Sequence, residues 1–326
     1  MFRISRITAT AVLFSFFAVS AKAETVPLKL GVLKFGTVNW ELNVLKHHKL
    51  DAKHGLDVQV NGFAGKQASS VALQGGAVDS IVTDWLWTSR QRAEGKGFAF
   101  IPYSVSVGAL MTANGSPIES IEDLPGRKIG IAGGPLDKSW LLMRALASEK
   151  HGLDLEKSVE KVFGAPPLLS RQLEDGNVDA VLTFWHFAAK LEAKGMRRVV
   201  DVGQIARELG IGAQVPQIGY VFNDDWVKAH PGKLKKFNDA LLEAKAILGW
   251  SNKEWERIRP LTKAKDDATF EALKKGYRDG IPTSWGDRER EEAAKLFGIL
   301  AEIGGVKLVG PGKGIEKGTF AESVTY

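Results

Sequence analysis

Residues 173–190 read LEDGNVDAVLTFWHFAAK, and residues 73–90, one hundred positions earlier, read LQGGAVDSIVTDWLWTSR. Each copy predicts a helix that ends at a glycine, a short apolar strand, and a Thr-x-Trp corner that opens a new helix. The identical positions are Leu73/Leu173, Gly76/Gly176, Val78/Val178, Asp79/Asp179, Thr83/Thr183 and Trp85/Trp185. A side chain just past a buried parallel strand faces the crevice where open α/β sheets bind ligands. The repeat therefore predicts two similar α/β halves, each directing a Thr and a Trp at a shared cleft.

The order of the remaining elements predicts an α/β fold with two lobes and a two-strand hinge. Strands at 28–33, 56–61 and 80–82 alternate with helices, which requires a parallel sheet with right-handed crossovers. A chain of 326 residues exceeds the usual size of one hydrophobic core. We expect the first lobe to be discontinuous, at residues 24–108 and 221–326, and the second to span 109–220. The segments 105–113 and 214–222 are the expected crossings. Helices are expected at 41–54, 224–229, 231–248, 266–277 and 288–303.

The amino terminus and the charge balance indicate an exported protein. Residues 1–23 have the basic start, apolar run and Ala-Lys-Ala cleavage site of a secretory signal peptide. Removing Arg3, Arg6 and Lys22 with it lowers the formal net charge from +6 to +3. No dense basic run is present, so we expect no nucleic-acid partner. The absence of cysteine excludes disulfides, thiol catalysis and cysteine-ligated metals.

The expected ligand-binding side chains follow strand ends or lie near the hinge. Asp84 suits an ammonium group, an amidine-like nitrogen or a sugar-like hydroxyl, or it caps the following helix. Trp85 and Trp185 suit stacking or cation–π contacts. His186 suits a hydrogen bond to a ligand or a buried structural role, and Lys66 is expected to be solvated. The full set is Thr37, Asn39, Trp40, Gln67, Thr83, Asp84, Trp85, Gly134, Trp185, His186 and Gln217.

Motifs of common enzyme classes are missing from the sequence. The Gly65-Lys66 pair lacks the other positions of a phosphate-binding loop, and no dinucleotide fingerprint or nucleophile elbow is present. His47 and Asp51 are spaced four apart on a predicted helix, which is more typical of a solvated face than of a metal site. We therefore predict no catalytic residue, cofactor or metal.

Four segments carry a resemblance to a known family: 28–33 (LKLGVL), 56–79 (LDVQVNGFAGKQASSVALQGGAVD), 121–132 (IEDLPGRKIGIA) and 222–231 (FNDDWVKAHP). The chain resembles the periplasmic solute-binding proteins of ABC importers in the nitrate, sulfonate and taurine group, close to the thiamine-pyrimidine-binding members. This resemblance implies a type II periplasmic-binding fold and a periplasmic location. It also implies a monomer that closes on a small-molecule ligand and delivers it to a permease in the inner membrane.

The turn at residues 133–137 (GGPLD) departs from the pattern of the sulfonate and nitrate members. Pro135 removes a backbone donor, and Asp137 repels an anion at the helix start. We therefore expect a nitrogen-containing or aromatic organic solute, with sulfonate or taurine-type anion binding as the alternative. Two further hypotheses are a pyrimidine-synthase-like enzyme with Lys66 as a Schiff-base residue and a ligand sensor for a membrane receptor.

Overall fold

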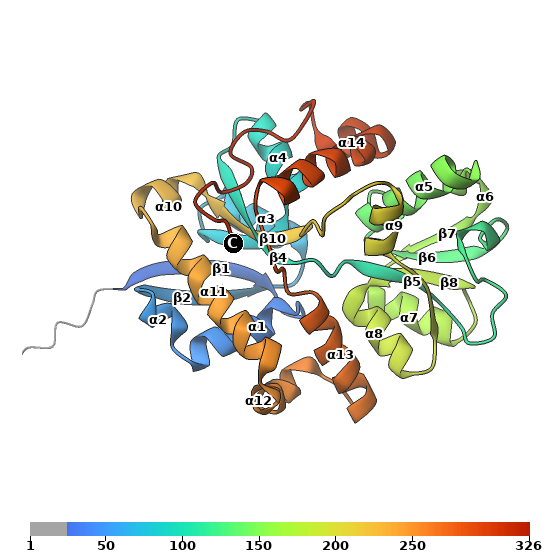
Figure 1. The fold of residues 1–326 in the computed structure, drawn as a ribbon, viewed down its shortest axis with the longest axis horizontal. Helices are drawn as coiled ribbons and strands as arrows, with labels where there is room; N and C mark the ends of the chain where they lie inside the picture. The colour runs from blue at the N-terminus through green and yellow to red at the C-terminus, as the bar shows by residue number, and fades with distance from the viewer. Residues whose placement is uncertain (1–24) are drawn as a thin grey trace, which may run out of the picture.

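Two five-stranded sheets, one in each lobe, organise the computed structural model, which describes residues 25–326 (Figure 1). The predicted signal peptide at residues 1–23 lies outside the described residues. The first sheet has the order β2 (Leu56–Phe63), β1 (Val26–Leu33), β3 (Ser80–Asp84), β10 (Ile218–Asn223), β4 (Phe98–Ser104). The second has the order β7 (Glu160–Gly164), β6 (Lys128–Ala132), β8 (Ala180–Phe184), β5 (Gly108–Thr112), β9 (Arg197–Asp201). The predicted two-lobe α/β fold is confirmed.

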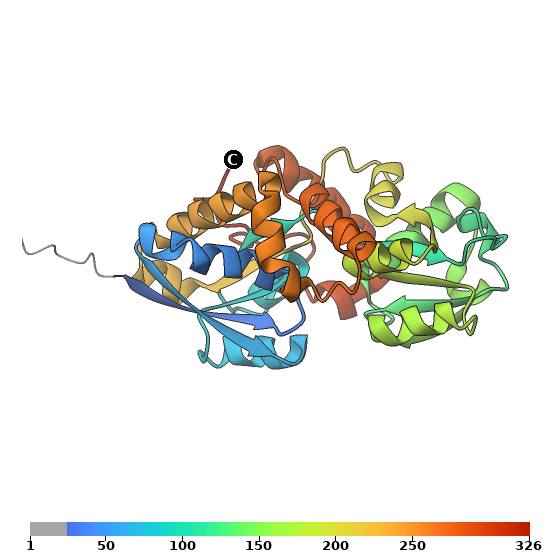
Figure 2. The same cartoon turned by 90° about the horizontal axis from the view of Figure 1, so that it is seen from below.

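Helices cover the faces of both sheets (Figures 1 and 2). They are α1 (Val38–His47), α2 (Leu50–Lys53), α3 (Lys66–Gln74), α4 (Trp85–Ala93), α5 (Lys138–His151), α6 (Leu155–Ser158), α7 (Pro166–Glu174), α8 (Trp185–Ala193), α9 (Val202–Glu208), α10 (Asp224–Ala229), α11 (Lys233–Trp250), α12 (Asn252–Thr262), α13 (Asp267–Asp279) and α14 (Asp287–Val309). None of the described helices is long and apolar enough to cross a membrane.

The repeated Gly and Asp positions have the same structural role in both lobes. Gly76 and Gly176 both end their turns in the left-handed region, at φ values of +70° and +73°. The Asp79 carboxylate accepts a hydrogen bond from the Lys29 backbone N–H at 2.8 Å, and Asp179 accepts one from Lys128 at 2.7 Å. Each aspartate therefore fixes the start of its strand against the neighbouring strand, β1 or β6.

The chain passes between the sheets twice. It leaves β4 and enters β5 across residues 105–107, and it returns between β9 and β10. Strand β10 then lies antiparallel between β3 and β4 of the first sheet. All strands of the second sheet therefore come from one continuous stretch of the chain. The first sheet also contains β10, which follows the second lobe in the sequence. The lobe boundaries at residues 108 and 221 stay a prediction.

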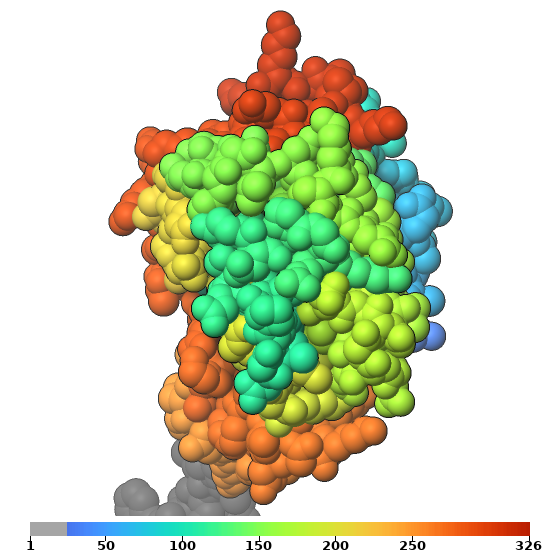
Figure 3. Space-filling model, turned by 90° about the vertical axis from the view of Figure 1, so that its right-hand side faces the viewer, coloured from blue at the N-terminus to red at the C-terminus, as the bar shows by residue number. Residues whose placement is uncertain are grey.

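The carboxyl-terminal helices lie between the lobes, and the final residues return to the first lobe (Figures 1 and 2). Helix α13 packs on α8 of the second lobe, and α14 contacts both α4 and α5. In the tail, the Phe100 N–H donates to the Thr319 carbonyl at 2.7 Å, and Trp285 and Tyr326 exchange two backbone hydrogen bonds. Figure 3, which looks onto the second lobe, shows the carboxyl-terminal residues in red and orange around its rim.

A polar network is buried within the first lobe under α1. Glu41 is fully buried and pairs with the Lys245 ammonium, whose side chain is 4% exposed. The hydroxyls of Tyr220 and Tyr277 donate to the same carboxylate at 2.9 and 2.8 Å. Burial, together with the negative charge of Glu41, raises the pKa of both tyrosines well above 10.0, so they remain donors. The network joins α1, α11, α13 and β10.

Several helices differ from the sequence prediction, since α6 and α9 were not expected and two longer helices also depart from it. The expected helix at 41–54 is divided, because the chain leaves α1 at His48 and Lys49 takes a left-handed conformation at φ 54° before α2. Helix α12 was not expected, since Pro260 indicates a break. Pro260 lies in the last turn of α12, and the fully buried Trp255 donates to the Leu248 carbonyl at 2.7 Å. This tertiary contact outweighs the tendency of proline to interrupt a helix.

Candidate functional site

The ends of the parallel strands and the starts of the following helices form the facing edges of the two lobes. In the first lobe these are the starts of α1, α3 and α4, and in the second they are the starts of α5 and α8. This is the edge at which α/β sheets bind ligands. Within residues 25–326, a charged contact and an aromatic contact join the lobes here.

The charged contact joins Asp84 at the end of β3 to Lys138 at the start of α5. The Lys138 Nζ donates to Asp84 Oδ2 at 3.0 Å, and the two side chains are only 17% and 14% exposed. Asp84 Oδ1 also accepts the Trp87 N–H at 2.8 Å, so it caps α4 as well. Asp84 therefore caps α4, which is one of the two roles that the sequence suggested, and its charged partner is a side chain of the other lobe. Its contact with a ligand stays a prediction.

Neighbouring charges keep this ion pair ionised. Burial alone would raise the pKa of Asp84, but Lys138 and Lys66 hold it below 3.8. Burial likewise opposes the charge of Lys138, but Asp84 and Asp137 raise its pKa above 10.5. Asp137, which caps α5, has a pKa raised by burial. The facing edges therefore carry lysines and carboxylates of both lobes close together.

Lys66 at the start of α3 is the member of this group without an ion-pair partner among the described residues. Its side chain is largely solvent-exposed, although its ammonium lies near the charges of Lys138, Asp84 and Asp137. Desolvation, together with repulsion from Lys138, lowers the pKa of Lys66 below 10.5. An acidic group placed beside Lys66 would relieve both effects.

The aromatic contact joins Trp40 of α1 to Trp185 of α8. Their ring centroids lie 6.1 Å apart at an interplanar angle of 88°, an edge-to-face arrangement. The Trp40 indole N–H donates to the Leu261 carbonyl of α12 at 3.2 Å. Trp185 also contacts α13, since a Cβ added at Gly276 would stand 2.9 Å from the indole. Trp185 therefore touches two elements that the sequence does not place beside it.

The prediction that Trp85 and Trp185 face each other over the cleft is wrong. Trp85 is 1% exposed and packs inside the first lobe, with its ring centroid 6.0 Å from that of Phe320 in the carboxyl-terminal tail. Trp40 takes its place as the partner of Trp185. The two Thr-x-Trp corners are alike in sequence, but the tail covers only the first.

Other predicted residues of the first lobe serve local structure. The Asn39 amide donates to the Leu33 and Gly36 carbonyls at 2.8 and 2.7 Å, so it closes the turn after β1 instead of presenting its amide N–H groups to a ligand. Thr37 is 8% exposed, and its hydroxyl lies 3.1 Å from that of Tyr103. Thr83 is also 8% exposed within β3. Gln67 is exposed in the first turn of α3.

Three predicted residues lie in the second lobe or beside the hinge. Gly134 adopts φ +90° in the turn before α5, a conformation that favours glycine. Burial, with repulsion from Lys190, lowers the pKa of His186 to about 3, so its imidazole is neutral at physiological pH. Among the described residues, His186 Nδ1 and Gln217 Oε1 have no hydrogen-bond partner. Both atoms are buried from solvent.

A cavity of about 420 Å³ lies beside the hinge. Its walls include Trp185 and Gln217, together with the charged side chains of Arg207 and Lys275. Lys138 and Asp84 do not line it. The cavity and the strand-end contacts between the lobes are therefore distinct places that share Trp185.

Sequence reasoning missed Lys138 and Gly276. Lys138 begins the helix that follows the first strand of the second lobe, which is the position where a cleft residue is expected. The sequence therefore indicates Lys138 as a cleft residue, although the sequence-based prediction names only the adjacent Asp137. Nothing local to Gly276 indicates its contact with Trp185, because the two residues lie far apart in the chain.

The family comparison agrees with this architecture. The chain matches the family described as NMT1/THI5 like over residues 52–248, more than half of its length, and it belongs to that family. No curated protein sequence matches the chain.

Solved structures show the same fold. The periplasmic aliphatic sulphonate binding protein of Escherichia coli aligns over 89% of this chain and 96% of its own, with 19% identity and a TM-score of 0.70. The alkanesulfonate-binding protein of Xanthomonas axonopodis pv. citri, bound to MOPS, aligns over 89% and 98%, with 17% identity and a TM-score of 0.65. The periplasmic nitrate-binding protein of Synechocystis PCC 6803 aligns over 81% and 71%, with 14% identity and a TM-score of 0.56. At these identities the likeness concerns the fold.

Proposed function

We propose that the protein is the periplasmic solute-binding component of an ABC importer. It holds a small organic solute between its lobes and delivers it, as a monomer, to a permease in the inner membrane. The observation that carries this proposal is that both lobes supply polar and aromatic groups to one edge, with Asp84 paired to Lys138 and Trp40 in contact with Trp185. The likeness to periplasmic binding proteins of known structure supports it.

Closure follows from this arrangement. A ligand that contacts both lobes stabilises only the form in which the lobes approach each other. The ion pair and the indole contact bias the protein toward the same form, because each is made between lobes. Release to a permease then requires that these contacts separate.

The chemistry of the cleft favours a solute with polar nitrogen atoms or an aromatic ring. Asp84 and Asp137 attract a cationic or N–H donor group, and Trp185 supplies an indole ring suited to stacking or cation–π contacts. The neutral His186 accepts or donates a hydrogen bond. One observation favours the anionic alternative, since Lys66 lacks an ion-pair partner among residues 25–326 and has a lowered pKa. A sulfonate or carboxylate on the same solute would pair with it.

Native mass spectrometry of the freshly purified protein identifies a co-purified solute, and calorimetric titration then measures its affinity. We expect Lys138→Met to weaken binding about 10–100-fold, the effect of losing a charged hydrogen-bonding group. Arg207→Met is the matched control, because Arg207 lines only the hinge cavity. Solutes with and without an acidic group distinguish the two ligand classes.

Equal affinity of the wild-type protein and the Lys138→Met variant would refute the cleft assignment. A loss confined to Arg207→Met would instead move the ligand site to the hinge cavity. Failure of both nitrogen-containing and sulfonate solutes to bind would refute the proposed substrate classes.

A further inference from the structure

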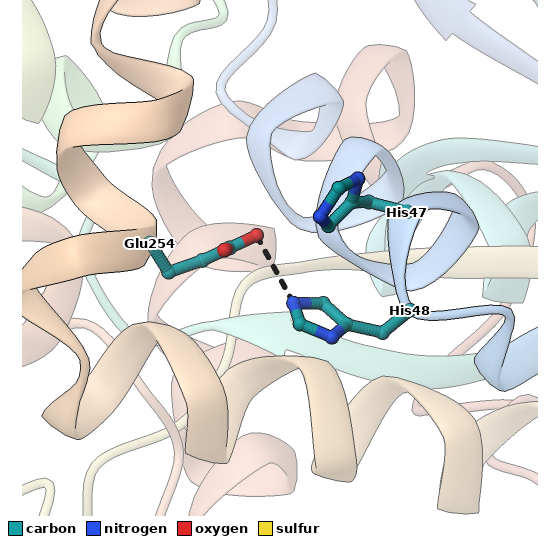
Figure 4. Close-up of side chains that lie close together, drawn as sticks. All are labelled: His47, His48 and Glu254. Atoms are coloured by element: carbon teal, nitrogen blue, oxygen red, sulfur yellow. Dashed lines mark ion pairs between the residues drawn. The ribbon is translucent and has the colours of Figure 1, made fainter.

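Two histidines at the end of α1 lie beside a glutamate of α12, outside the cleft. His47 is the last residue of α1, and His48 follows it where the chain turns toward α2. Their ring centroids are 4.9 Å apart at an interplanar angle of 90°, and both side chains are exposed. Figure 4 shows both imidazoles and the Glu254 side chain gathered in the space between these elements. One ligand atom from each residue lies within 4.8 Å of the other two.

Glu254 is held in place by its surroundings. It stands in the first turn of α12, and its side chain is 8% exposed. Arg257 Nε donates to Glu254 Oε1 at 2.9 Å, and His48 Nε2 lies 3.3 Å from the same oxygen. Within residues 25–326, Oε2 accepts no hydrogen bond, so it is available.

We propose that His47, His48 and Glu254 form a site for a divalent transition-metal ion, with Zn²⁺ as the best fit. Two imidazoles and one carboxylate are a known ligand set for zinc, and imidazole favours zinc over magnesium or calcium. Zinc bonds of about 2.0–2.1 Å in a tetrahedron place ligand atoms about 3.4 Å apart. Because both imidazoles are exposed, small rotations bring them into this range, and water completes the coordination. Arg257 is a positioning residue that orients the carboxylate.

A metal at this place would join two segments that are far apart in the chain. His47 belongs to the same helix as Trp40, and Glu254 belongs to the helix whose Leu261 carbonyl receives the Trp40 indole N–H. Binding would therefore stabilise the α1–α12 pair that positions the first-lobe side of the aromatic contact. A metal that binds the folded state raises the midpoint of thermal unfolding.

The test uses tag-free full-length protein, stripped with a chelator and titrated with ZnCl₂ in a calorimeter. We expect one saturable site and a rise in the unfolding midpoint with added zinc. The double variant His47→Gln/His48→Gln should lose more than about tenfold in affinity, since loss of orienting residues alone has effects of that size. His151→Gln is the matched control, because His151 is another surface histidine with a carboxylate neighbour, Glu122.

Glu254→Gln gives a second variant that keeps the shape of the side chain and should also weaken binding. Circular dichroism without zinc checks that each variant is folded. The X-ray absorption spectrum of the zinc complex should show two imidazole ligands. The proposal is overturned if the wild-type protein gives no saturable binding, if the double variant binds as the wild type does, or if His151→Gln loses as much affinity.

Discussion

Lys245 inside the first lobe is a buried charge, and its effect on stability depends on its partner, Glu41. Its ammonium is buried with Glu41, and burial lowers the pKa of Lys245 although Glu41 opposes this effect. Lys245→Met would leave the Glu41 carboxylate buried without its counter-charge. We expect the free energy of unfolding to fall by about 3–5 kcal/mol, as measured by urea denaturation.

Lys235→Met on the exposed side of the same helix is the control for Lys245→Met. Lys235 is 62% exposed and pairs with Asp239 at 3.0 Å, so its replacement should change the free energy of unfolding by no more than about 0.5 kcal/mol. A loss below about 1 kcal/mol for Lys245→Met would contradict the assigned role of the ion pair.

At the residue scale, the sequence predicted the repeat but not the surroundings of its tryptophans. Gly76 and Gly176, and likewise Asp79 and Asp179, have matching roles because their contacts are local or involve a neighbouring strand. Trp85 is different, since Phe320, which covers it, lies more than two hundred positions later in the chain. No pattern within either copy carries that information.

Helix α13 connects the hinge to the second lobe. The Ser104 hydroxyl donates to the Gly280 carbonyl at 3.1 Å, and the Ser106 hydroxyl donates to the Gly276 carbonyl at the same distance. The hinge segment is thus attached to the end of α13, while the side of this helix packs on α8. A rotation of the second lobe about the hinge must therefore slide or separate these two helices.

Gly276→Ala tests this contact because the new methyl group would lie 2.9 Å from the Trp185 ring. We expect the overpacking to cost about 1–3 kcal/mol, partly offset by about 1 kcal/mol of helix propensity, and to favour the open form. Small-angle X-ray scattering should show a larger radius of gyration. Gly298→Ala in α14 is the control, since an added Cβ there meets nothing within 4 Å and should leave the radius of gyration unchanged.

A Gly276→Ala protein with unchanged scattering and unchanged ligand affinity would show that the α13–α8 contact does not control closure.

At the element scale, most strands and longer helices were predictable, whereas α6, α9, α12 and the division of the first helix were not. The short apolar strands that follow each glycine turn have a strong local signal. Helix α12 was missed because Pro260 indicates a break, whereas the buried side chain of Trp255 holds the helix in place. The expected helix at 41–54 was too long because no residue type predicted the left-handed turn at Lys49.

For the whole molecule, the ion pair between Asp84 and Lys138 should set part of the balance between open and closed forms. Asp84→Asn keeps an acceptor for the Trp87 N–H but removes the charge. We expect a larger radius of gyration without ligand and a weaker apparent affinity, since less of the protein is in the binding-competent form. Scattering and calorimetry measure these two quantities, and an unchanged radius of gyration would contradict the prediction.

The contribution of the Asp84–Lys138 ion pair to the closed form depends on pH in a defined direction. The folded-state pKa of Asp84 lies below 3.8 and that of Lys138 lies above 10.5. The ion pair therefore contributes fully between these two ordinary values. Its contribution is lost as pH falls through the folded pKa of Asp84 or rises through that of Lys138.

The route of the chain through the two sheets has a consequence for the order of its assembly during synthesis. The second sheet is complete once residues up to Asp201 have been made. The first sheet lacks its fourth strand until residue 223, and Trp85 lacks its cover until Phe320 emerges at the far end of the chain. The lobe that is translated first is therefore the one that matures last, and a nascent chain that is released early would carry a finished second half beside an unfinished first half.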